Sequence, residues 1–164
     1  MHIGNELLAS VFADSSAFCG KEDVLHALIY HRLLGAGYSH NRLAREQALN
    51  NNRIDLVLFG NDMAGDFSET KKKPLVAIEV KGGAYGNRNA LKDTIDASGY
   101  CTDMAKLKPE AARGGTQLQT VFLGVDGRTK GLPLALVQTL IDESQNLGNG
   151  LIYFNRGGIV TTRP

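Results

Sequence analysis

The sequence predicts a single α/β domain over residues 1–164, in which helices flank a central mixed β-sheet of about four to five strands. Three observations predict this class: apolar runs of strand length, amphipathic helical patterns, and clusters of turn residues between them. A chain of 164 residues can bury a core without disulfides or a structural metal. The elements follow the order helix, three strands, helix, strand, helix, strand.

Apolar residues spaced three and four positions apart predict the helices. Gly35 and Gly148 follow two of these patterns, and Pro133 stands where a first helical position is expected. The predicted helices span residues 3–12, 21–34, 90–107 and 133–147.

Short apolar runs between turn residues predict the strands. The first two flank the turn cluster 50–53 and are expected to form a hairpin. The third is apolar on both faces, which is typical of a buried strand. The predicted strands span residues 42–49, 54–59, 75–81, 120–125 and 151–154.

Three charged residues lie in two of these core strands. Glu79 and Lys81 share one face at the end of the third strand, just before Gly82, and Asp55 is the only acid in the run 54–59. Burying charge is unfavourable unless the charge is paired or binds a metal. The charged groups are therefore expected to form either a functional site or a buried ion pair, Glu79–Lys81 or Asp55–Lys81.

An aspartate in one strand, followed in the next by a carboxylate and a lysine two residues apart, resembles the PD-(D/E)XK nuclease superfamily. Here the motif consists of Asp55, Glu79 and Lys81, with Ile54 where the motif has proline. The resemblance covers roughly residues 20–125 and implies a restriction-endonuclease-like sandwich. It also implies an endonuclease that hydrolyses phosphodiester bonds, favouring DNA over RNA, in a restriction, repair, recombination or phage- or toxin-borne role.

The resemblance assigns catalytic roles to the three motif residues. Asp55 and Glu79 offer hard oxygen ligands, which suit Mg²⁺, and Mn²⁺ is expected to substitute. The resemblance adds the backbone carbonyl of Val80 and the carboxylate of Glu22 as further ligands. Lys81 is expected to position or deprotonate the attacking water, or to stabilise charge on the phosphorane.

Nucleic acid is the expected partner, although the net charge is only +1. Such a balance gives no global attraction to phosphate, so binding depends on a local basic surface. By resemblance, Lys106, Arg88 and Lys92 are the residues expected to contact nucleic acid. The lysines at 71–73 could also touch phosphate, but a solvated run in a loop is the alternative.

Several of these residues have simpler explanations. Glu22 lies in the first turn of a helix, where an acid complements the helix dipole. Glu46 could approach the metal site or form a surface pair with a nearby arginine. Asp103 and Lys106, one turn apart, could form a local ion pair. A non-catalytic member of the same fold, binding nucleic acid or protein, is the alternative function.

Other enzyme classes and locations are disfavoured. The sequence contains no phosphate-binding loop, no His-Glu-x-x-His and no Gly-x-Ser-x-Gly motif. The four histidines lack the spacing of metal ligands relative to one another and are expected to be structural or exposed. They are His2, His26, His31 and His40. Cys19 and Cys101 match no zinc or redox motif, and no apolar run is long enough to span a membrane. A cytoplasmic protein that forms a homodimer is expected.

Overall fold

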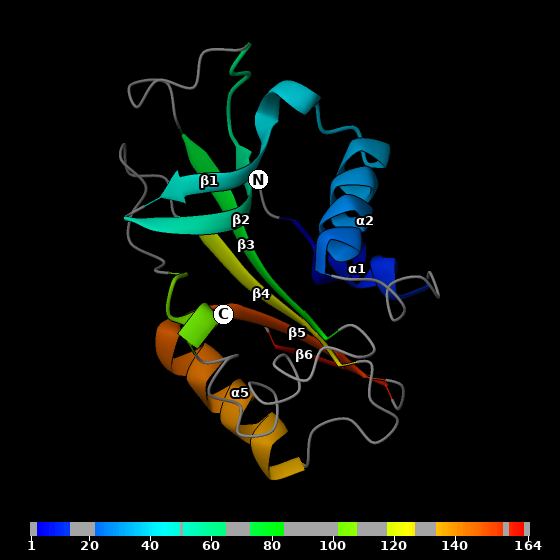
Figure 1. Cartoon of the computed structure of the whole chain (residues 1–164), viewed down its shortest axis with the longest axis vertical. Helices are drawn as coiled ribbons and strands as arrows, with labels where there is room; N and C mark the ends of the chain where they lie inside the picture. Colours follow the sequence, from blue (N-terminus) through cyan, green and yellow to red (C-terminus); the bar gives the residue numbers. More distant parts are fainter. Residues whose placement is uncertain are drawn as a thin grey trace.

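The structure, a computed structural model, describes eight segments of the chain (Figure 1). These are residues 3–13, 22–49, 51–64, 73–83, 102–107, 118–126, 134–155 and 158–162.

Six strands form one mixed, open sheet in which spatial order follows sequence order. The first three strands are antiparallel, the middle three run parallel, and the last turns back antiparallel to its neighbour. The strands are β1 (Leu43–Leu49), β2 (Asn52–Phe59), β3 (Pro74–Gly83), β4 (Gln119–Asp126), β5 (Gly150–Asn155) and β6 (Gly158–Thr162).

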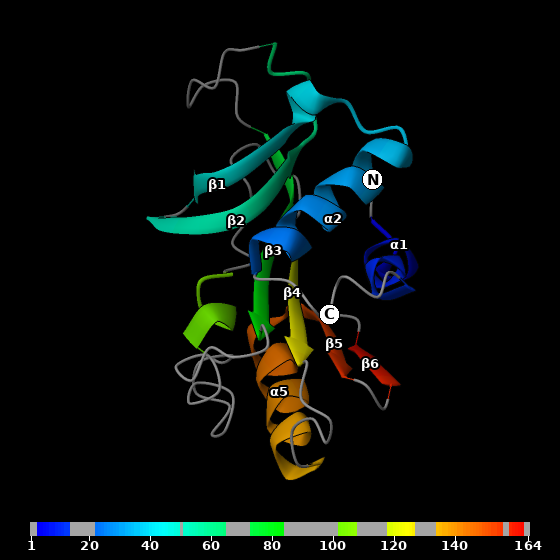
Figure 2. The same ribbon diagram turned by 45° about the vertical axis from the view of Figure 1, so that its right-hand side comes forward.

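Helices cover both faces of this sheet (Figure 2). On one face lie α1 (Asn5–Ala9), the 3₁₀ turn η1 (Ser10–Ala13) and α2 (Glu22–Gly35), and on the other lies α5 (Leu134–Leu147). A second 3₁₀ turn, η3 (His40–Arg42), leads into β1. None of the described helices is long and apolar enough to cross a bilayer.

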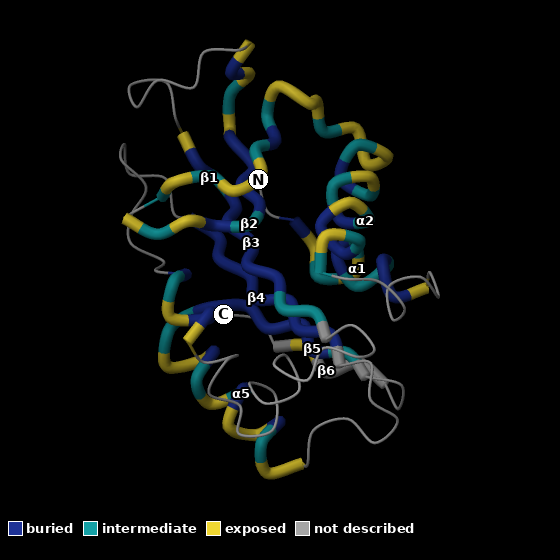
Figure 3. The backbone as a smooth tube through the Cα atoms, viewed as in Figure 1, coloured by how far each residue is buried: buried dark blue, intermediate teal, exposed yellow. Residues whose placement is uncertain are grey.

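Two apolar clusters separate these layers, and the central strands β2 to β5 are the most buried of the described residues (Figure 3). In the first cluster, Leu25, Ile29 and Leu33 of α2 pack against residues that include Ile78 and Val80. The opposite cluster joins α5 to the other face of the sheet and to the segment 102–107. The domain is thus a three-layer α/β/α arrangement.

Most predicted elements are confirmed within one or two residues. The hairpin forms between β1 and β2, with Asn51 at φ +64° in its turn, and Gly148 follows α5 at φ +69°. Both residues adopt the left-handed conformation that asparagine and glycine tolerate best. The periodicity of this sequence is therefore a sound guide to where its helices and strands lie.

Two predictions need correction, and one is only partly described. β6 adds a sixth strand that the sequence interpretation missed, although residues 159–162 are all β-branched. Strict alternation along the third predicted strand would place Leu75 on the face opposite Val76, but Leu75 packs with the cluster that contains Val76, near the β2–β3 register shift at Phe59. Of the predicted helix 90–107, residues 102–107 fall within the described residues; only 102–104 are helical, and 105–107 lie outside the helix.

Helix α2 sits unusually close to the end of β3 at Gly82. A Cβ atom built on Gly82 would collide with Cδ1 of Leu25, which is buried in the core. Overpacking a core of this kind typically costs about 1–3 kcal/mol. The absence of a side chain at Gly82 therefore allows α2 to approach the sheet here.

We expect Gly82→Ala to lower the free energy of unfolding by about 1–3 kcal/mol in urea titrations. Gly35→Ala is the matched control, because a Cβ there meets no atom within 4 Å and the change should stay within about 0.5 kcal/mol. Equal stability of the two variants would show that α2 does not approach β3 in this way.

Candidate functional site

The candidate site lies where β2 and β3 stop pairing. Their ladder ends at Leu56 opposite Ile78. Beyond this pair, backbone N–H groups donate to side-chain carboxylates and no longer to the neighbouring strand. The Val80 N–H donates to Asp55 Oδ2 at 2.7 Å, and the Asp55 N–H donates to Glu79 Oε2 at 3.3 Å. These reciprocal bonds hold both carboxylates beside the strand ends and satisfy backbone donors that would otherwise lack partners.

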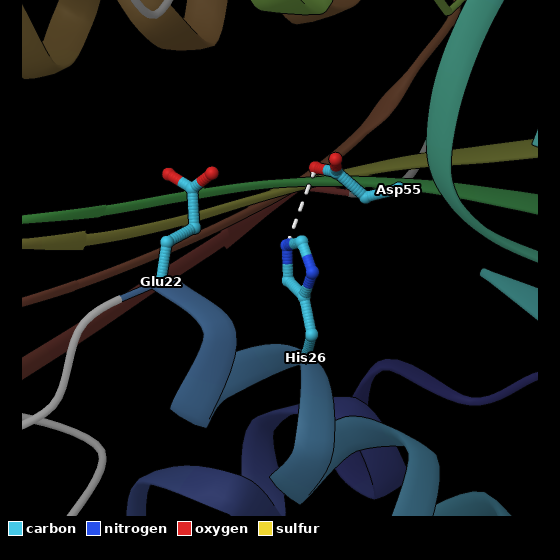
Figure 4. Close-up of side chains that lie close together, drawn as sticks. All are labelled: Glu22, His26 and Asp55. Atoms are coloured by element: carbon cyan, nitrogen blue, oxygen red, sulfur yellow. Dashed lines mark ion pairs between the residues drawn. The ribbon is translucent and has the colours of Figure 1, made fainter. Parts of the chain in front are cut away.

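The first turns of α2 contribute Glu22 and His26 to the same place. The two residues are four positions apart and therefore share one helix face. Glu22 Oε2 accepts the Gly82 N–H at 3.1 Å, which ties the start of α2 to the end of β3. Figure 4 shows the His26 ring directed toward the Asp55 carboxylate, with the Glu22 carboxylate beside it.

These three side chains form a group that could hold a metal ion. One potential ligand atom of each of Glu22, His26 and Asp55 lies within 4.8 Å of the other two. Nε2 of His26 is 3.6 Å from Asp55 Oδ2, too long for a hydrogen bond. The His26 side chain is only 3% exposed, and its Nε2 has no hydrogen-bond partner. Two carboxylates and an unpartnered imidazole nitrogen are a donor set that fits a divalent cation.

The other ring nitrogen of His26 is paired with Arg45. Arg45 Nη2 lies 3.2 Å from His26 Nδ1. A guanidinium can only donate, so this contact requires an unprotonated Nδ1 and places the ring proton on Nε2. The same guanidinium lies 3.8 Å from Asp23 Oδ1 at the surface.

On the far side of Glu79, two lysines and a second aspartate form a chain of ion pairs. Lys106 Nζ lies 2.6 Å from Glu79 Oε1 and 2.7 Å from Asp103 Oδ1. Lys81 Nζ lies 2.9 Å from Asp103 Oδ2. Asp103 therefore links both lysines, and Lys106 neutralises the buried Glu79.

Two amide side chains fix the segment 102–107 that carries Asp103 and Lys106. Asn149 is fully buried, and its amide donates to the Met104 carbonyl at 3.1 Å while its Oδ1 accepts from Thr120 at 2.5 Å. Asn52 donates to the Lys106 carbonyl at 3.3 Å. The ion pairs are thus positioned by contacts to β2, β4 and the start of β5.

Acidic groups outnumber cationic groups at the site, and their pKa values respond. Burial raises the pKa of Glu79 to about 7 with help from Asp55, although Lys106 opposes the rise. Burial also raises the pKa of Glu22. Burial lowers the pKa of His26, but Asp55 and Glu22 more than compensate, so the pKa is raised. Added positive charge would stabilise this arrangement.

The structure groups some of the predicted site residues and separates others. Asp55 and Glu22 lie together, but Glu79 lies outside the group within 4.8 Å and its carboxylate pairs with Lys106. Lys81 pairs with Asp103 rather than with Glu79 or Asp55 in any ion pair that the described residues show.

Other predicted site residues are placed as follows. Val80, a predicted ligand through its carbonyl, directs its N–H to Asp55. Glu46 forms the surface alternative, an exposed pair with Arg53 at 2.7 Å. Arg88, Lys92 and residues 71–72 lie outside the described residues.

Two residues of the site were missed from the sequence. The spacing of the histidines relative to one another does not reveal His26, whereas its spacing of four from Glu22 is the informative signal. The sequence predicts Asp103 only as a local partner of Lys106. That local pair exists, but Asp103 also holds Lys81.

Comparison with known protein families, curated proteins and solved structures finds no match to this chain.

The raised pKa of Glu79 gives a pH-dependent stability that can be measured. Between its ordinary value of 4.5 and about 7, the folded protein binds more protons at Glu79 than the unfolded chain does. Stability contributed by this group is therefore lost as pH rises through that window. Without metal, we expect Glu79→Gln to gain up to roughly 3 kcal/mol relative to wild type as the pH rises from 4.5 to 7.

Urea unfolding at several pH values in chelator measures this difference. Free energies of unfolding that stay parallel for the two proteins across the window would contradict a raised Glu79 pKa.

Proposed function

We propose that the protein is a metal-dependent nuclease of the restriction-endonuclease-like fold, which hydrolyses phosphodiester bonds, with DNA as the preferred substrate. The observation that carries this proposal is the junction of β2 and β3. There Asp55 contacts Glu79 and Val80 of the next strand, and faces Glu22 on the helix before the sheet. The order of helix, three antiparallel strands, and then parallel strands supports the same fold.

The donor set supports a metal at Asp55. A bound divalent cation would lower the pKa of a water molecule and neutralise charge on the phosphate. Asp55 and Glu22 are the nearest oxygen ligands, and Glu79 lies next to Asp55 through the Asp55 N–H. The carboxylates are held in place by the Gly82 and Val80 N–H groups, so the site requires little reorganisation.

The lysines supply positive charge on the other side of Glu79. Lys106 and Lys81 are partly exposed, at 37% and 25% of their side-chain surface. A phosphate approaching the site would therefore meet ammonium groups near the segment 102–107 and the potential metal ligands near α2. This separation of charge suits an anionic substrate whose reacting phosphate must contact both.

The ion pairs also favour a second candidate, a non-catalytic module of the same fold. Asp103 bridges Lys81 and Lys106, and Lys106 neutralises Glu79. Such a network could serve only to satisfy buried charge. The two candidates differ in whether removing Lys81 changes a reaction rate or only stability.

A panel of substrates tests the proposal directly. Supercoiled plasmid, linear duplex, single-stranded DNA and RNA are incubated with the protein and Mg²⁺ or Mn²⁺, with chelator as control. We expect cleavage of at least one DNA substrate that depends on the metal. Absence of cleavage on every substrate with both ions would favour the binding module.

Removing the Asp55 carboxylate should weaken metal binding and cleavage together. We expect calorimetry to show at least a tenfold weaker Mn²⁺ affinity for Asp55→Asn, since even groups that only support metal ligands contribute about 10–100-fold. Glu46→Gln is the control, because Glu46 is an exposed acid on the neighbouring strand that pairs with Arg53. Unchanged affinity in Asp55→Asn would place the metal elsewhere.

Lys81→Met separates catalysis from structure. Asp103 keeps Lys106 as a partner at 2.7 Å, so the substitution leaves the Asp103 carboxylate paired and should change stability little. If Lys81 acts on the attacking water or the transition state, turnover should fall about 10²–10⁴-fold while metal binding persists.

The control is Arg53→Met, which removes an exposed cation of β2 that pairs with Glu46. Wild-type cleavage rates in a folded Lys81→Met protein would remove Lys81 from the mechanism. A large loss of stability would instead identify it as a structural partner of Asp103.

A further inference from the structure

The buried ring nitrogen Nε2 of His26 has no hydrogen-bond partner, although it lies 3.6 Å from Asp55 Oδ2. Among the described residues, its Nε2 is a buried side-chain nitrogen without a hydrogen bond, and the ring is directed at Asp55 (Figure 4). Buried polar atoms almost always have a partner, because an unsatisfied one is costly. An arrangement that leaves Nε2 unsatisfied between two carboxylates calls for a ligand at that position.

A single cation at this position would contact all three side chains. Glu22 and His26 come from adjacent turns of α2, and Asp55 comes from β2, so the donors approach from two elements. Ligand atoms about 2.1 Å from one ion lie at most about 4.2 Å apart. Because the three atoms already lie within 4.8 Å, only a slight inward movement is needed.

The nitrogen donor changes which ion the site should prefer. Mg²⁺ favours oxygen ligands and retains water, whereas imidazole suits first-row transition metals. We propose that His26 is a direct metal ligand, and that with Glu22 and Asp55 it forms a nitrogen–oxygen–oxygen site selective for a divalent transition metal ion over Mg²⁺. This proposal shares one assumption with the proposed function, namely that a cation binds at Asp55. It replaces the all-oxygen Mg²⁺ site that the sequence predicts.

Binding through Nε2 also involves Arg45. The contact of Arg45 with Nδ1 requires the ring proton on Nε2, the atom that would bind the metal. Coordination therefore moves that proton to Nδ1, where Arg45 can no longer donate. Asp23 Oδ1, 3.8 Å from the same guanidinium nitrogen, provides the alternative partner for Arg45.

Electron spin echo spectroscopy of bound Mn²⁺ tests the direct contact, because it detects a nitrogen nucleus coordinated to the ion. The full chain is loaded with Mn²⁺ and compared with protein that contains ¹⁵N-labelled histidine. We expect a ¹⁴N coupling in the unlabelled protein that is replaced by a ¹⁵N coupling on labelling. This readout does not depend on nuclease activity.

Two substitutions on the same helix assign the coupling. His26→Gln replaces the nitrogen donor with a carboxamide, whereas His31→Gln makes the same change at an exposed position of α2. We expect the coupling to persist in His31→Gln and to vanish in His26→Gln. In calorimetry, the ratio of Mn²⁺ to Mg²⁺ affinity should fall at least about tenfold in His26→Gln only.

The outcomes distinguish this inference from the proposed function. Two results would overturn the role of His26: Mn²⁺ binding without histidine coupling, and a coupling that survives in His26→Gln. Neither result would contradict the proposed metal-dependent nuclease. Failure of wild type to bind either ion would overturn both. If His26→Gln does not fold, persistence of the coupling in single glutamine variants of His2, His31 and His40 assigns it to His26 by elimination.

Discussion

The rest of the site depends on an excess of carboxyl groups where α2 meets β2 and β3. Glu22 and Asp55 lie on the α2 side, and Glu79 and Asp103 lie toward the segment 102–107. Two lysines form ion pairs with the second set, whereas the first set accepts the Val80 and Gly82 N–H groups and faces the His26 ring. Burying unbalanced negative charge is unfavourable in a folded protein. A cation at Asp55 would remove that imbalance.

Three backbone N–H groups stabilise the buried carboxylates at this junction by hydrogen bonds. The Val80 N–H fixes Asp55, the Gly82 N–H fixes Glu22, and the Asp55 N–H fixes Glu79. Each bond depends on β3 extending beyond the last pair of its ladder with β2, at Ile78. The large apolar clusters on both faces of the sheet compensate for a polar junction that contributes little to stability by itself.

The sequence was a good guide to the sheet and a weaker guide to the contacts across it. The alternation of side chains along a strand depends only on residues that are close in the sequence. The sequence was therefore enough to place Asp55, Glu79 and Lys81 in two core strands. It did not predict that Asp55 would face α2 while Glu79 faces Lys106, because strand pairing ends between them. The role of His26 depends on how a helix packs on strands about thirty residues away, which no local pattern encodes.

The most direct test of a cation at Asp55 is anomalous diffraction from crystals of the full chain soaked in Mn²⁺. A strong peak bonded to an Asp55 carboxylate oxygen, between Glu22 and His26, is the predicted result. A peak found only at other acids, or no peak at concentrations that saturate binding in solution, would contradict a metal centre at the β2–β3 junction.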